Sequence, residues 1–345
     1  MKLGIIGAGT MSKLHLEACR RVGVTVAAIA DRSREGAEAR AAEFGIPGVY
    51  TDPTELFADP SIDAVIIATP VSTHTSLVLE ALAKGKHVLC EKPPAMSAAE
   101  IDEMIAARNA SGKVLLFGFV RRYDPRIRAL RERCLAGDFG RILFGEAQRL
   151  ARLSFPGGWF SDRRYTKGGS FFDAAIHEVD ALLYILGYPA LRSVRAYLDR
   201  ENSDLAVRLN AVGRGYASAS RGDFRNDVET SVTVFAETED GIPLLFRSTA
   251  ATPTLNEGPL VRLTGSRLSA GIDAAEAKLV SLGEDGFTEG AITEKANNLD
   301  TQLRHFVDCI ENGASPVAPA EDALALMRFF DAVYLSGDKG CAVTL

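Results

Sequence analysis

Apolar runs alternate with amphipathic stretches along the first third of the chain. Five runs are short and rich in apolar and β-branched residues: 2–6, 24–31, 63–70, 86–93 and 113–119. Such runs are typical of parallel strands whose two faces are both buried. Three of the intervening stretches are predicted helices: 11–21, 73–84 and 98–109. The alternation predicts a doubly wound parallel α/β sheet with right-handed crossovers, in which ligands bind beyond the carboxyl ends of the strands.

This tight alternation stops after residue 121. Four β-type runs follow, parted by turns that contain Gly and Pro: 229–237, 242–250, 260–265 and 277–283. Two amphipathic helices are predicted to close the chain, near 299–312 and 320–336. We therefore expect two domains, residues 1–121 with the parallel sheet and residues 122–345 with an α+β architecture.

A glycine turn follows the first predicted strand. The turn reads GAGTMS and leads into the first helix. Gly7 permits the tight turn, and Gly9 lets a pyrophosphate approach the free N–H groups at the start of the helix. Ser12 stands where a third glycine is usual, at a position that needs only a small residue for helix–strand packing. Strand, glycine turn and helix in this order predict a Rossmann domain that binds a dinucleotide.

The second strand ends in Asp31, at about the 20-residue distance expected for the carboxylate that binds the ribose hydroxyls. A carboxylate there repels a 2′-phosphate, which favours NAD over NADP. Arg32 follows directly and weakens this preference, because a guanidinium can stack on adenine or bind a phosphate. The alternative is that Asp31 only ends a strand and caps a turn, which the strand–turn–helix–strand context disfavours.

Three polar residues interrupt the apolar segment GGSFFDAAIHEVDAL at 168–182. Asp173, His177 and Asp180 follow one another at offsets of four and three, which on a helix places them on one face. A helix that packs on a core does not normally carry three polar residues on its inner face. Either this face lines a polar cleft or the three side chains satisfy one another in the core.

Composition narrows the classes of function. The 345 residues are 47% hydrophobic and 24% charged, with a net charge of −6, which disfavours binding to a phosphate backbone. No segment approaches the roughly 20 apolar residues of a membrane span. The opening apolar run is short and interrupted by Gly, unlike a signal peptide, and the five cysteines form no CxxC pair. We expect a cytoplasmic protein with reduced thiols and no metal site, whose partners include neither nucleic acid nor membrane.

Several blocks together resemble a known family. The blocks GIIGAGTM, ATPVSTH, GKHVLCEKP, GFVRRYDP and GGSFFDAAIHEVD stand in this order between residues 2 and 187. They resemble the glucose–fructose oxidoreductase and inositol dehydrogenase (Gfo/Idh/MocA) family, and CEKP is the most diagnostic. The resemblance implies a Rossmann domain followed by an α+β domain with a large, open, mainly antiparallel sheet. It also implies NAD as the cofactor, with NADP use left open, and a homodimer or homotetramer formed through the second sheet.

The resemblance further implies that Lys92, Asp173 and His177 are the catalytic residues. Oxidation of an alcohol with NAD removes a hydride from carbon and a proton from oxygen, so the protein must handle the proton. An imidazole such as that of His177 is suited to general-base work near neutrality. Asp173 can orient this imidazole or bind a neighbouring hydroxyl, and the ammonium of Lys92 can stabilise the developing alkoxide. Pro93 follows Lys92, and the bond between them can be cis or trans.

Two sets of candidate binding residues result. The candidates for the cofactor are Gly7, Gly9, Thr10, Met11, Asp31, Arg32, Thr69, Pro70, His74, Glu91 and Lys92. The candidates for the substrate are Lys92, Arg121, Trp159, Asp173, His177 and Asp180.

Several roles in these sets stay open. Asp180 contacts a substrate hydroxyl or anchors its helix, and Arg122 contacts substrate or forms a structural salt bridge. Trp159 lies in a broken loop that covers the substrate or packs in a core or interface. His15 and His74 are better explained by packing and helix starts, and the resemblance places Glu91 near the nicotinamide ribose.

The leading expectation is a dehydrogenase that uses NAD(P) and acts on a cyclic polyol or sugar, closest in its motifs to the inositol dehydrogenases. The alternatives are a carbonyl or keto-sugar reductase, a glycoside hydrolase that uses NAD transiently, and a sensor that binds NAD without turnover. A sensor needs no acid–base residues, so the joint presence of Lys92, Asp173 and His177 argues against the last alternative.

Overall fold

The chain forms two compact units. The computed structural model describes residues 1–152, 157–201, 223–250, 253–255 and 258–345. Unit 1 comprises Met1–Val120 and Asn297–Leu324, and unit 2 comprises Arg121–Ala296 and Ala325–Leu345. The first crossing lies beside the predicted boundary at residue 121, but the single-boundary prediction is wrong for residues 297–324, which return to unit 1.

Helix α10 (Asn298–Glu311) explains this return. Its buried residues Leu303, Phe306 and Cys309 join the same core cluster as Leu3 and Leu16 of the N-terminal segment. The periodicity of this segment predicted a helix, but an amphipathic helix does not specify which apolar surface its face will cover.

A second contact fixes α10 on unit 1. The guanidinium of Arg21, at the end of helix α1 (Thr10–Val22), donates to both carboxylate oxygens of Asp300 at 2.7–3.0 Å. Because Arg21 and Asp300 lie far apart in the sequence, the local pattern around either residue does not predict their contact.

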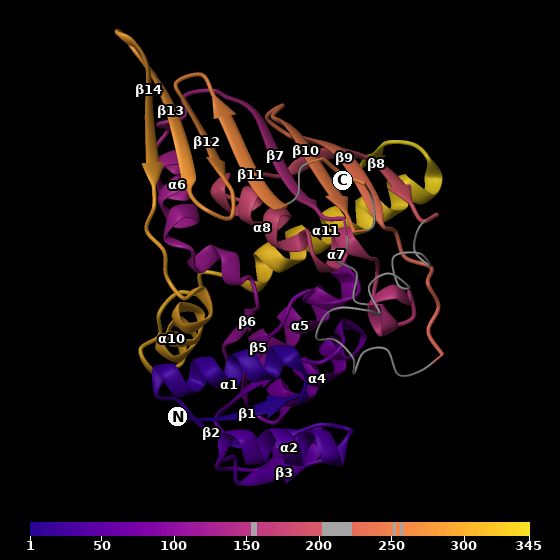
Figure 1. Ribbon diagram of the computed structural model, residues 1–345. Helices are drawn as coiled ribbons and strands as arrows, with labels where there is room; N and C mark the ends of the chain where they lie inside the picture. Colours follow the sequence, from indigo (N-terminus) through magenta and orange to yellow (C-terminus); the bar gives the residue numbers. More distant parts are fainter. Residues whose placement is uncertain (153–156, 202–222, 251–252, 256–257) are drawn as a thin grey trace. The chain divides into compact units, whose positions relative to one another are not determined.

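Unit 1 is built on a parallel six-stranded sheet of order β3-β2-β1-β4-β5-β6 (Figure 1). The strands are β1 (Lys2–Ile6), β2 (Thr25–Ala30), β3 (Gly48–Tyr50), β4 (Ala64–Ile67), β5 (His87–Cys90) and β6 (Leu115–Phe117). Its other helices are α2 (Arg34–Phe44), α3 (Pro53–Ala58), α4 (His74–Ala83) and α5 (Ala98–Ser111). The predicted fold class is confirmed, and every residue of β4 is buried, as expected for a strand covered on both faces.

The local sequence patterns did not indicate α2, β3 and α3. The buried residues of α2 are only two alanines, Ala37 and Ala41, so its apolar face gives a weak signal. Strand β3 has three residues and α3 has six, which is too short for a period to be read.

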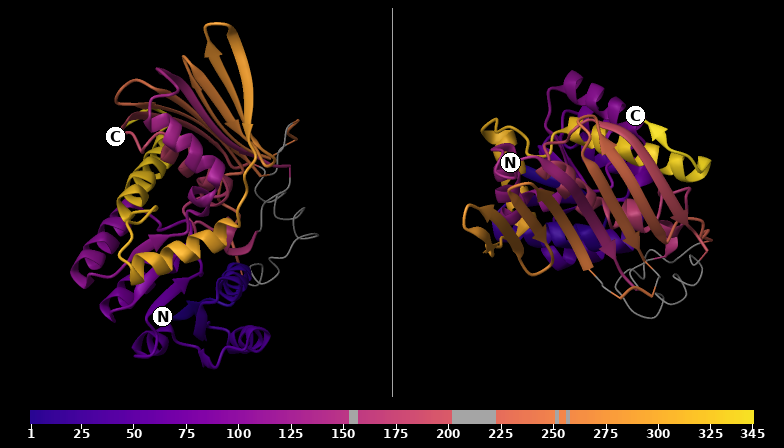
Figure 2. Two further views of the ribbon diagram at one scale, coloured as in Figure 1. Left: turned by 90° about the vertical axis from the view of Figure 1, so that its left-hand side faces the viewer. Right: turned by 90° about the horizontal axis from the view of Figure 1, so that it is seen from above.

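Unit 2 carries a nine-stranded sheet of order β14-β13-β12-β11-β7-β10-β9-β8-β15 (Figure 2). The strands are β7 (Ile142–Leu150), β8 (Leu191–Asp199), β9 (Ser231–Thr238), β10 (Pro243–Thr249), β11 (Gly258–Gly265), β12 (Leu268–Ile272), β13 (Ala277–Gly283), β14 (Gly286–Ile292) and β15 (Val343–Thr344). All neighbours are antiparallel except β7 and β10, which confirms a large and mainly antiparallel second sheet.

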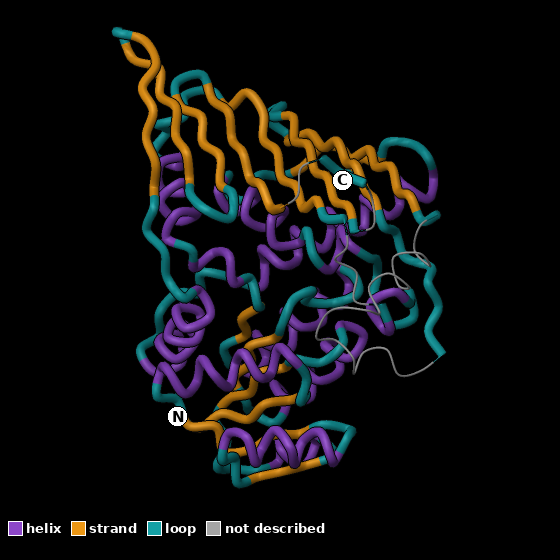
Figure 3. The backbone as a smooth tube through the Cα atoms, in the orientation of Figure 1, coloured by secondary structure: helices purple, strands orange, loops and turns teal. Residues whose placement is uncertain are grey.

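The described helices of unit 2 lie on one face of its sheet, as the tube view shows (Figure 3). They are α6 (Pro125–Leu135), α7 (Ser170–Asp173), α8 (Ile176–Ile185) and the part of α11 (Ala320–Lys339) that follows residue 324. Phe246 of β10 packs on Phe329 of α11, and Phe171 of α7 packs on both Phe329 and Phe330. This aromatic cluster fixes α7, and hence the Asp173 segment, on the sheet.

No described helix of the chain is long and apolar enough to cross a membrane.

Candidate active site

The carboxyl ends of the unit 1 strands form a pocket with about 950 Å³ of empty volume that is continuous with solvent. Six of the predicted cofactor residues line it: Gly7, Gly9, Asp31, Arg32, Thr69 and Pro70. The pocket also uses side chains that the sequence analysis missed: Pro53, Thr73, Ser76 and Leu77. Thr73 stands in the ATPVSTH block, directly before His74, so this block was the available signal for it.

The glycine turn has the geometry that a dinucleotide requires. Gly7 has φ +102°, and a Cβ there would stand 2.5 Å from the carbonyl oxygen of Ala68, so only glycine fits. A Cβ at Gly9 would meet nothing within 4 Å, which leaves open space in front of the turn. Gly9 is the N-cap of α1 and no side chain caps that helix, so the N–H groups of the first turn, at Thr10 and Met11, are available to a phosphate.

Asp31 is held in a fixed position at the edge of this pocket. Its Oδ2 accepts a hydrogen bond from the N–H of Ala8 at 2.7 Å, and its Oδ1 accepts from the N–H of Ser33 at 2.8 Å. Arg32, next to it, is exposed. The open space at Gly9, the uncapped helix start and the fixed carboxylate together fit the pyrophosphate and ribose of NAD.

Lys92 lies at the same edge of the sheet as the pocket. Strands β1, β4 and β5 are neighbours, with Ile6 paired to Ile67 and Ile67 paired to Cys90. Thr69 and Lys92 each stand two residues beyond the pairing Ile67–Cys90, so both extend from the carboxyl ends of adjacent strands. Lys92 is half-buried, and its peptide bond to Pro93 is cis.

Glu91 and His74 are buried behind this edge and do not line the pocket. Glu91 is 6% exposed, its Oε1 lies 2.6 Å from Nε2 of His15, and its Oε2 accepts from the N–H of Lys92 at 3.0 Å. The ring of His74 lies between the carbonyl oxygens of Thr69 and Pro93. The carboxylate of Glu91 is thus engaged with His15 and with the backbone of Lys92, and its approach to the nicotinamide ribose stays what the family resemblance implies.

The segment around Asp173 and His177 is not one continuous helix. Helix α7 ends at Asp173, α8 begins at Ile176, and the N–H groups of both Ala174 and Ala175 point to the carbonyl of Ser170. Asp173 and His177 are half-buried at this junction. Asp180, three residues after His177 on α8, is 1% exposed.

Asp180 belongs to a buried ion pair. The guanidinium of Arg122 donates to both of its carboxylate oxygens at 2.6–3.1 Å, and the hydroxyl of Tyr188 donates to Oδ1 at 2.5 Å. Arg122 is fully buried, and its Cζ lies 4.9 Å and 5.0 Å from the ring centroids of Tyr184 and Tyr188. The predicted substrate contact of Asp180 is therefore replaced by the anchoring alternative, and Arg122 takes the structural role.

A buried carboxylate fixes the start of α7. Oε1 of Glu229 accepts hydrogen bonds from the N–H groups of Gly169 and Phe171 and from the hydroxyl of Tyr334, at 2.8–3.3 Å. A Cβ at Gly168 would overlap the Tyr334 hydroxyl, and one at Gly169 would overlap the backbone oxygen of Glu229. This packing requires the two glycines before the Asp173 segment. The local sequence around Glu229 does not indicate that its carboxylate holds this segment.

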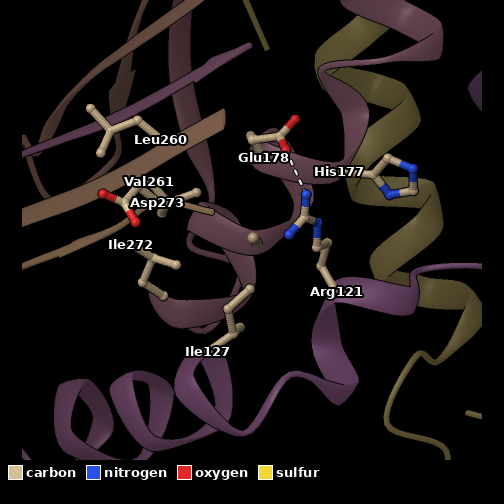
Figure 4. A pocket seen from close by; sticks show the side chains of 9 residues that line it. Arg121, Ile127, His177, Glu178, Leu260, Val261, Ile272 and Asp273 are labelled. Atoms are coloured by element: carbon tan, nitrogen blue, oxygen red, sulfur yellow. Dashed lines mark hydrogen bonds and ion pairs between the residues drawn. The ribbon is translucent and has the colours of Figure 1, made fainter. Parts of the chain in front are cut away.

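A small pocket lies beside His177 within unit 2 (Figure 4). Figure 4 shows Arg121 reaching toward Glu178, while Glu178 and His177 project in different directions from the start of α8. Nη2 of Arg121 lies 3.4 Å from Oε1 of Glu178, and Nη1 of Arg149 lies 3.5 Å from the same oxygen. The structure thus places Arg121 beside His177, and Glu178, which the sequence analysis passed over, holds it there.

Trp159 lies in a short 3-10 turn, Gly158–Ser161, and stacks on Phe160 with ring centroids 3.6 Å apart. The indole is half-buried. Phe155 and Pro156, which precede Trp159 in the predicted loop, lie outside the described residues.

Comparisons with known proteins agree with this architecture. The family described as "Oxidoreductase family, NAD-binding Rossmann fold" matches residues 1–119, and the "GFO/IDH/MocA C-terminal domain" matches residues 127–270. The D-glucoside 3-dehydrogenase of Escherichia coli (strain K12) is 28% identical over 354 residues, covering 100% of this chain and 97% of that protein. The inositol 2-dehydrogenase of Klebsiella pneumoniae (strain 342) is 34% identical over 213 residues, covering 61% of each chain.

A solved structure shares the fold. Levoglucosan dehydrogenase in complex with NADH has a TM-score of 0.86 at 22% identity, covering 100% of this chain and 98% of that one. The resemblance noted in the sequence is confirmed over both units, and NAD is confirmed as the cofactor type. The chain belongs to the Gfo/Idh/MocA family of NAD-binding oxidoreductases.

Proposed function

We propose that the protein is an NAD-dependent dehydrogenase that oxidises a secondary alcohol of a cyclic polyol or sugar. The observation that carries the proposal is the position of Lys92, which extends from the strand end next to the one that supplies Thr69 to the cofactor pocket. An ammonium at this edge can act on a reacting hydroxyl, whereas a protein that binds NAD without turnover does not need one.

In the proposed reaction, Lys92 and His177 handle the proton of the substrate hydroxyl. The Lys92 ammonium donates a hydrogen bond to the hydroxyl oxygen, lowers its pKa and stabilises the alkoxide as it develops. His177 accepts the proton as general base, and Asp173, at the end of α7, orients the imidazole or binds an adjacent hydroxyl. Bound NAD supplies the hydride acceptor. In the reverse direction the same residues return the proton to a carbonyl oxygen.

The substrate class rests on two supports. A relative that matches the full chain is named as a glucoside dehydrogenase, and one that matches 61% of it is named as an inositol dehydrogenase. The half-buried Asp173 and His177 and the neighbouring Arg121 offer donors and acceptors to several hydroxyls, with Trp159 proposed as an apolar face for a sugar ring.

The cofactor form follows from Asp31. Its carboxylate is fixed by the N–H groups of Ala8 and Ser33, so it stays in place to bind ribose hydroxyls and to repel a 2′-phosphate. We expect Asp31→Ala to weaken NAD binding far more than NADP binding in a fluorescence titration. Equal losses for both would remove the ribose role from Asp31.

A turnover assay tests the main proposal. The protein is mixed with NAD or NADP and a panel of inositols, aldoses, glycosides and linear polyols, and reduced nicotinamide is followed by absorbance. We expect one cyclic class to react, and Lys92→Ala and His177→Ala each to lower kcat by about 10²–10³-fold with NAD affinity largely kept. If no compound of the panel reacts although NAD binds tightly, the result would favour the carbonyl reductase, transient-NAD hydrolase or sensor alternatives.

We also propose that the open face of the unit 2 sheet forms a homodimer or homotetramer. In the right-hand view of Figure 2 none of the described helices of unit 2 lies in front of this face. It exposes aromatic side chains, with Tyr197 56% and Phe235 54% exposed on adjacent strands. Light scattering after size exclusion tests the assembly, and Phe235→Asp is expected to shift it toward the monomer. A monomeric parent protein would overturn this part.

A further inference from the structure

Two buried histidines of unit 1 hold the backbone on either side of Lys92. On one side stands Glu91, whose carboxylate contacts Nε2 of His15 at 2.6 Å and the N–H of Lys92 at 3.0 Å. On the other side stands Pro93, whose carbonyl oxygen lies 2.9 Å from Nδ1 of His74. Lys92 is thus framed by two residues that are each tied to an imidazole.

In the hydrogen bond between His15 and Glu91, the donor and the acceptor can be assigned. Burial opposes ionisation of Glu91, but the hydrogen bond from His15 and the charges of His15 and Lys92 outweigh it and hold the pKa of the carboxyl below its usual range. An ionised carboxylate only accepts, so Nε2 of His15 carries the proton. Nδ1 of His15 is buried and has no hydrogen-bond partner among the described residues, so Glu91 is the polar contact that the ring makes there.

Neighbouring backbone leaves Glu91 little freedom to move. A Cβ at Gly118 would lie 2.8 Å from Oε2 and 3.1 Å from Cα of Glu91, so the absence of a side chain at Gly118 makes room for this carboxylate. The N–H of Glu91 also donates to the carbonyl of Ile67 at 2.9 Å. Tight packing of this kind transmits a displacement of Glu91 directly to the next residue.

Each histidine also belongs to an element that builds the cofactor pocket. His15 lies on α1, the helix that begins at the glycine turn, and Nε2 of His74 lies 2.9 Å from the carbonyl oxygen of Thr69, a pocket residue. The ring of His15 therefore connects the Lys92 segment to the glycine-turn helix. The ring of His74 stands between the carbonyl oxygens of Pro93 and Thr69 and, as a neutral imidazole, donates to one of them.

We propose that His15 and His74 are positioning residues that set the place of the Lys92 ammonium relative to the bound nicotinamide, acting through the backbone of Glu91 and Pro93. The inference deepens the proposed function and rests on it. A displacement of about 1 Å in a catalytic group can cost 10²-fold in rate, so loss of either ring should lower kcat by about 10- to 100-fold.

The variants separate hydrogen bonding from packing. His15→Leu and His74→Leu remove the polar contacts and keep apolar volume. His15→Gln returns a donor near the place of Nε2. His74→Asn returns a donor near the place of Nδ1, facing Pro93, and His74→Gln returns one near Nε2, facing Thr69. Because Pro93 adjoins Lys92, His74→Asn should keep more activity than His74→Gln.

A matched control lies at the other end of the same strand. His87 opens β5, and its Nδ1 accepts a hydrogen bond from the N–H of Val114 at 3.0 Å. His87→Leu thus removes a hydrogen-bonding imidazole from the same sheet without touching the Lys92 segment. We expect it to change the melting temperature and leave kcat unchanged.

Two readouts decide the inference. The first is steady-state kinetics with NAD affinity by titration: the Leu variants should lose kcat about 10- to 100-fold with a change in NAD Kd below about threefold, and His15→Gln and His74→Asn should recover much of the loss. The second is the pKa of the Lys92 amine, measured by NMR after reductive methylation with ¹³C-formaldehyde. It should shift in the Leu variants and match the parent in His87→Leu.

The inference is overturned if the Leu variants lose no more kcat than His87→Leu, or if the Lys92 amine titrates identically in all of them. Should the Leu variants fail to fold, the difference between His74→Asn and His74→Gln decides alone, and equal activity in these two overturns the role of His74. Should the parent protein turn over no polyol, the proposed function fails, and the amine titration still decides whether the histidines position Lys92.

Discussion

The Lys92 segment of unit 1 and the Asp173–His177 segment of unit 2 are held in different ways. Lys92 is fixed through its backbone, by hydrogen bonds that involve two histidines and one carboxylate. The Asp173–His177 junction is fixed by buried charges: Glu229 before it, and the Arg122–Asp180 pair behind it. The difference predicts that substitutions of the residues that hold Lys92 mainly affect turnover, whereas substitutions of the buried charges that hold the junction mainly affect stability.

The largest expected effect comes from breaking the Arg122–Asp180 pair. Asp180→Ala leaves the guanidinium of Arg122 fully buried without its counter-charge, and loss of one partner of such a pair costs about 3–5 kcal/mol. We expect a marked fall in the free energy of unfolding, measured by denaturant titration. A fall below about 1 kcal/mol would show that the pair does not anchor α8.

The double variant Arg122→Met/Asp180→Leu sharpens this test. Replacing both charges by apolar side chains of similar volume is often neutral or stabilising for a buried pair. The double variant should therefore recover most of the stability that Asp180→Ala loses. If it is as unstable as the single variant, the pair contributes more than a mutual neutralisation of charge.

Two glycines test the same contrast at intermediate size. Gly168→Ala places a methyl group against the Tyr334 hydroxyl and Oε2 of Glu229, an overpacking expected to cost about 1–3 kcal/mol. Gly9→Ala meets nothing within 4 Å and keeps an ordinary extended backbone, so stability should change by less than about 0.5 kcal/mol. Its methyl group enters space that a pyrophosphate needs, so NAD affinity should fall about tenfold, equivalent to about 1.4 kcal/mol.

Thermal melts and NAD titrations of both glycine variants check this prediction. Gly168→Ala, in unit 2, should change the melting temperature, and Gly9→Ala, in unit 1, should change the NAD affinity. The reverse assignment, an unstable Gly9→Ala with unchanged NAD affinity, would contradict the proposed pocket.

The smallest expected effect is a difference in acid response. Burial lowers the pKa of His74 and of His87 below the usual 6.5, so below about pH 6.5 the unfolded chain binds more protons than unit 1 does. Unit 1 therefore loses stability as the pH falls from 7 to 5, by about 1.4 kcal/mol for each unit of pKa difference.

Unit 2 has the opposite contribution in this window. Burial raises the pKa of Glu229, so acidification favours its folded, protonated form, while the lowered pKa values of Asp124 and Asp162 matter only nearer pH 4. Hydrogen exchange at pH 7 and 5, corrected for the intrinsic rate, should show protection falling in unit 1 more than in unit 2. Equal losses would contradict the comparison, and a His74→Leu/His87→Leu variant should flatten the response of unit 1.

Local patterns were sufficient for much of the fold. All strands of unit 1 except β3 were predictable because burial on both faces leaves continuous apolar runs, and α1, α4 and α5 were predictable from their amphipathic periodicity. The pocket residues Gly7, Gly9 and Asp31 were predictable because they stand at fixed distances on one strand–turn–helix–strand unit. Elements such as α2, β3 and α3 were missed because short or alanine-rich segments carry little periodicity.

The sequence by itself determined the fold class, the dinucleotide pocket and the family, since each depends on neighbouring residues at fixed spacing. Only the tertiary structure decided that Asp180 pairs with Arg122, that Glu229 fixes the start of α7, and that α10 returns to unit 1. The physical reason is common to all three. A helix pattern shows which face is apolar, but the partner of a buried charge or apolar face comes from a distant part of the chain and is chosen by packing.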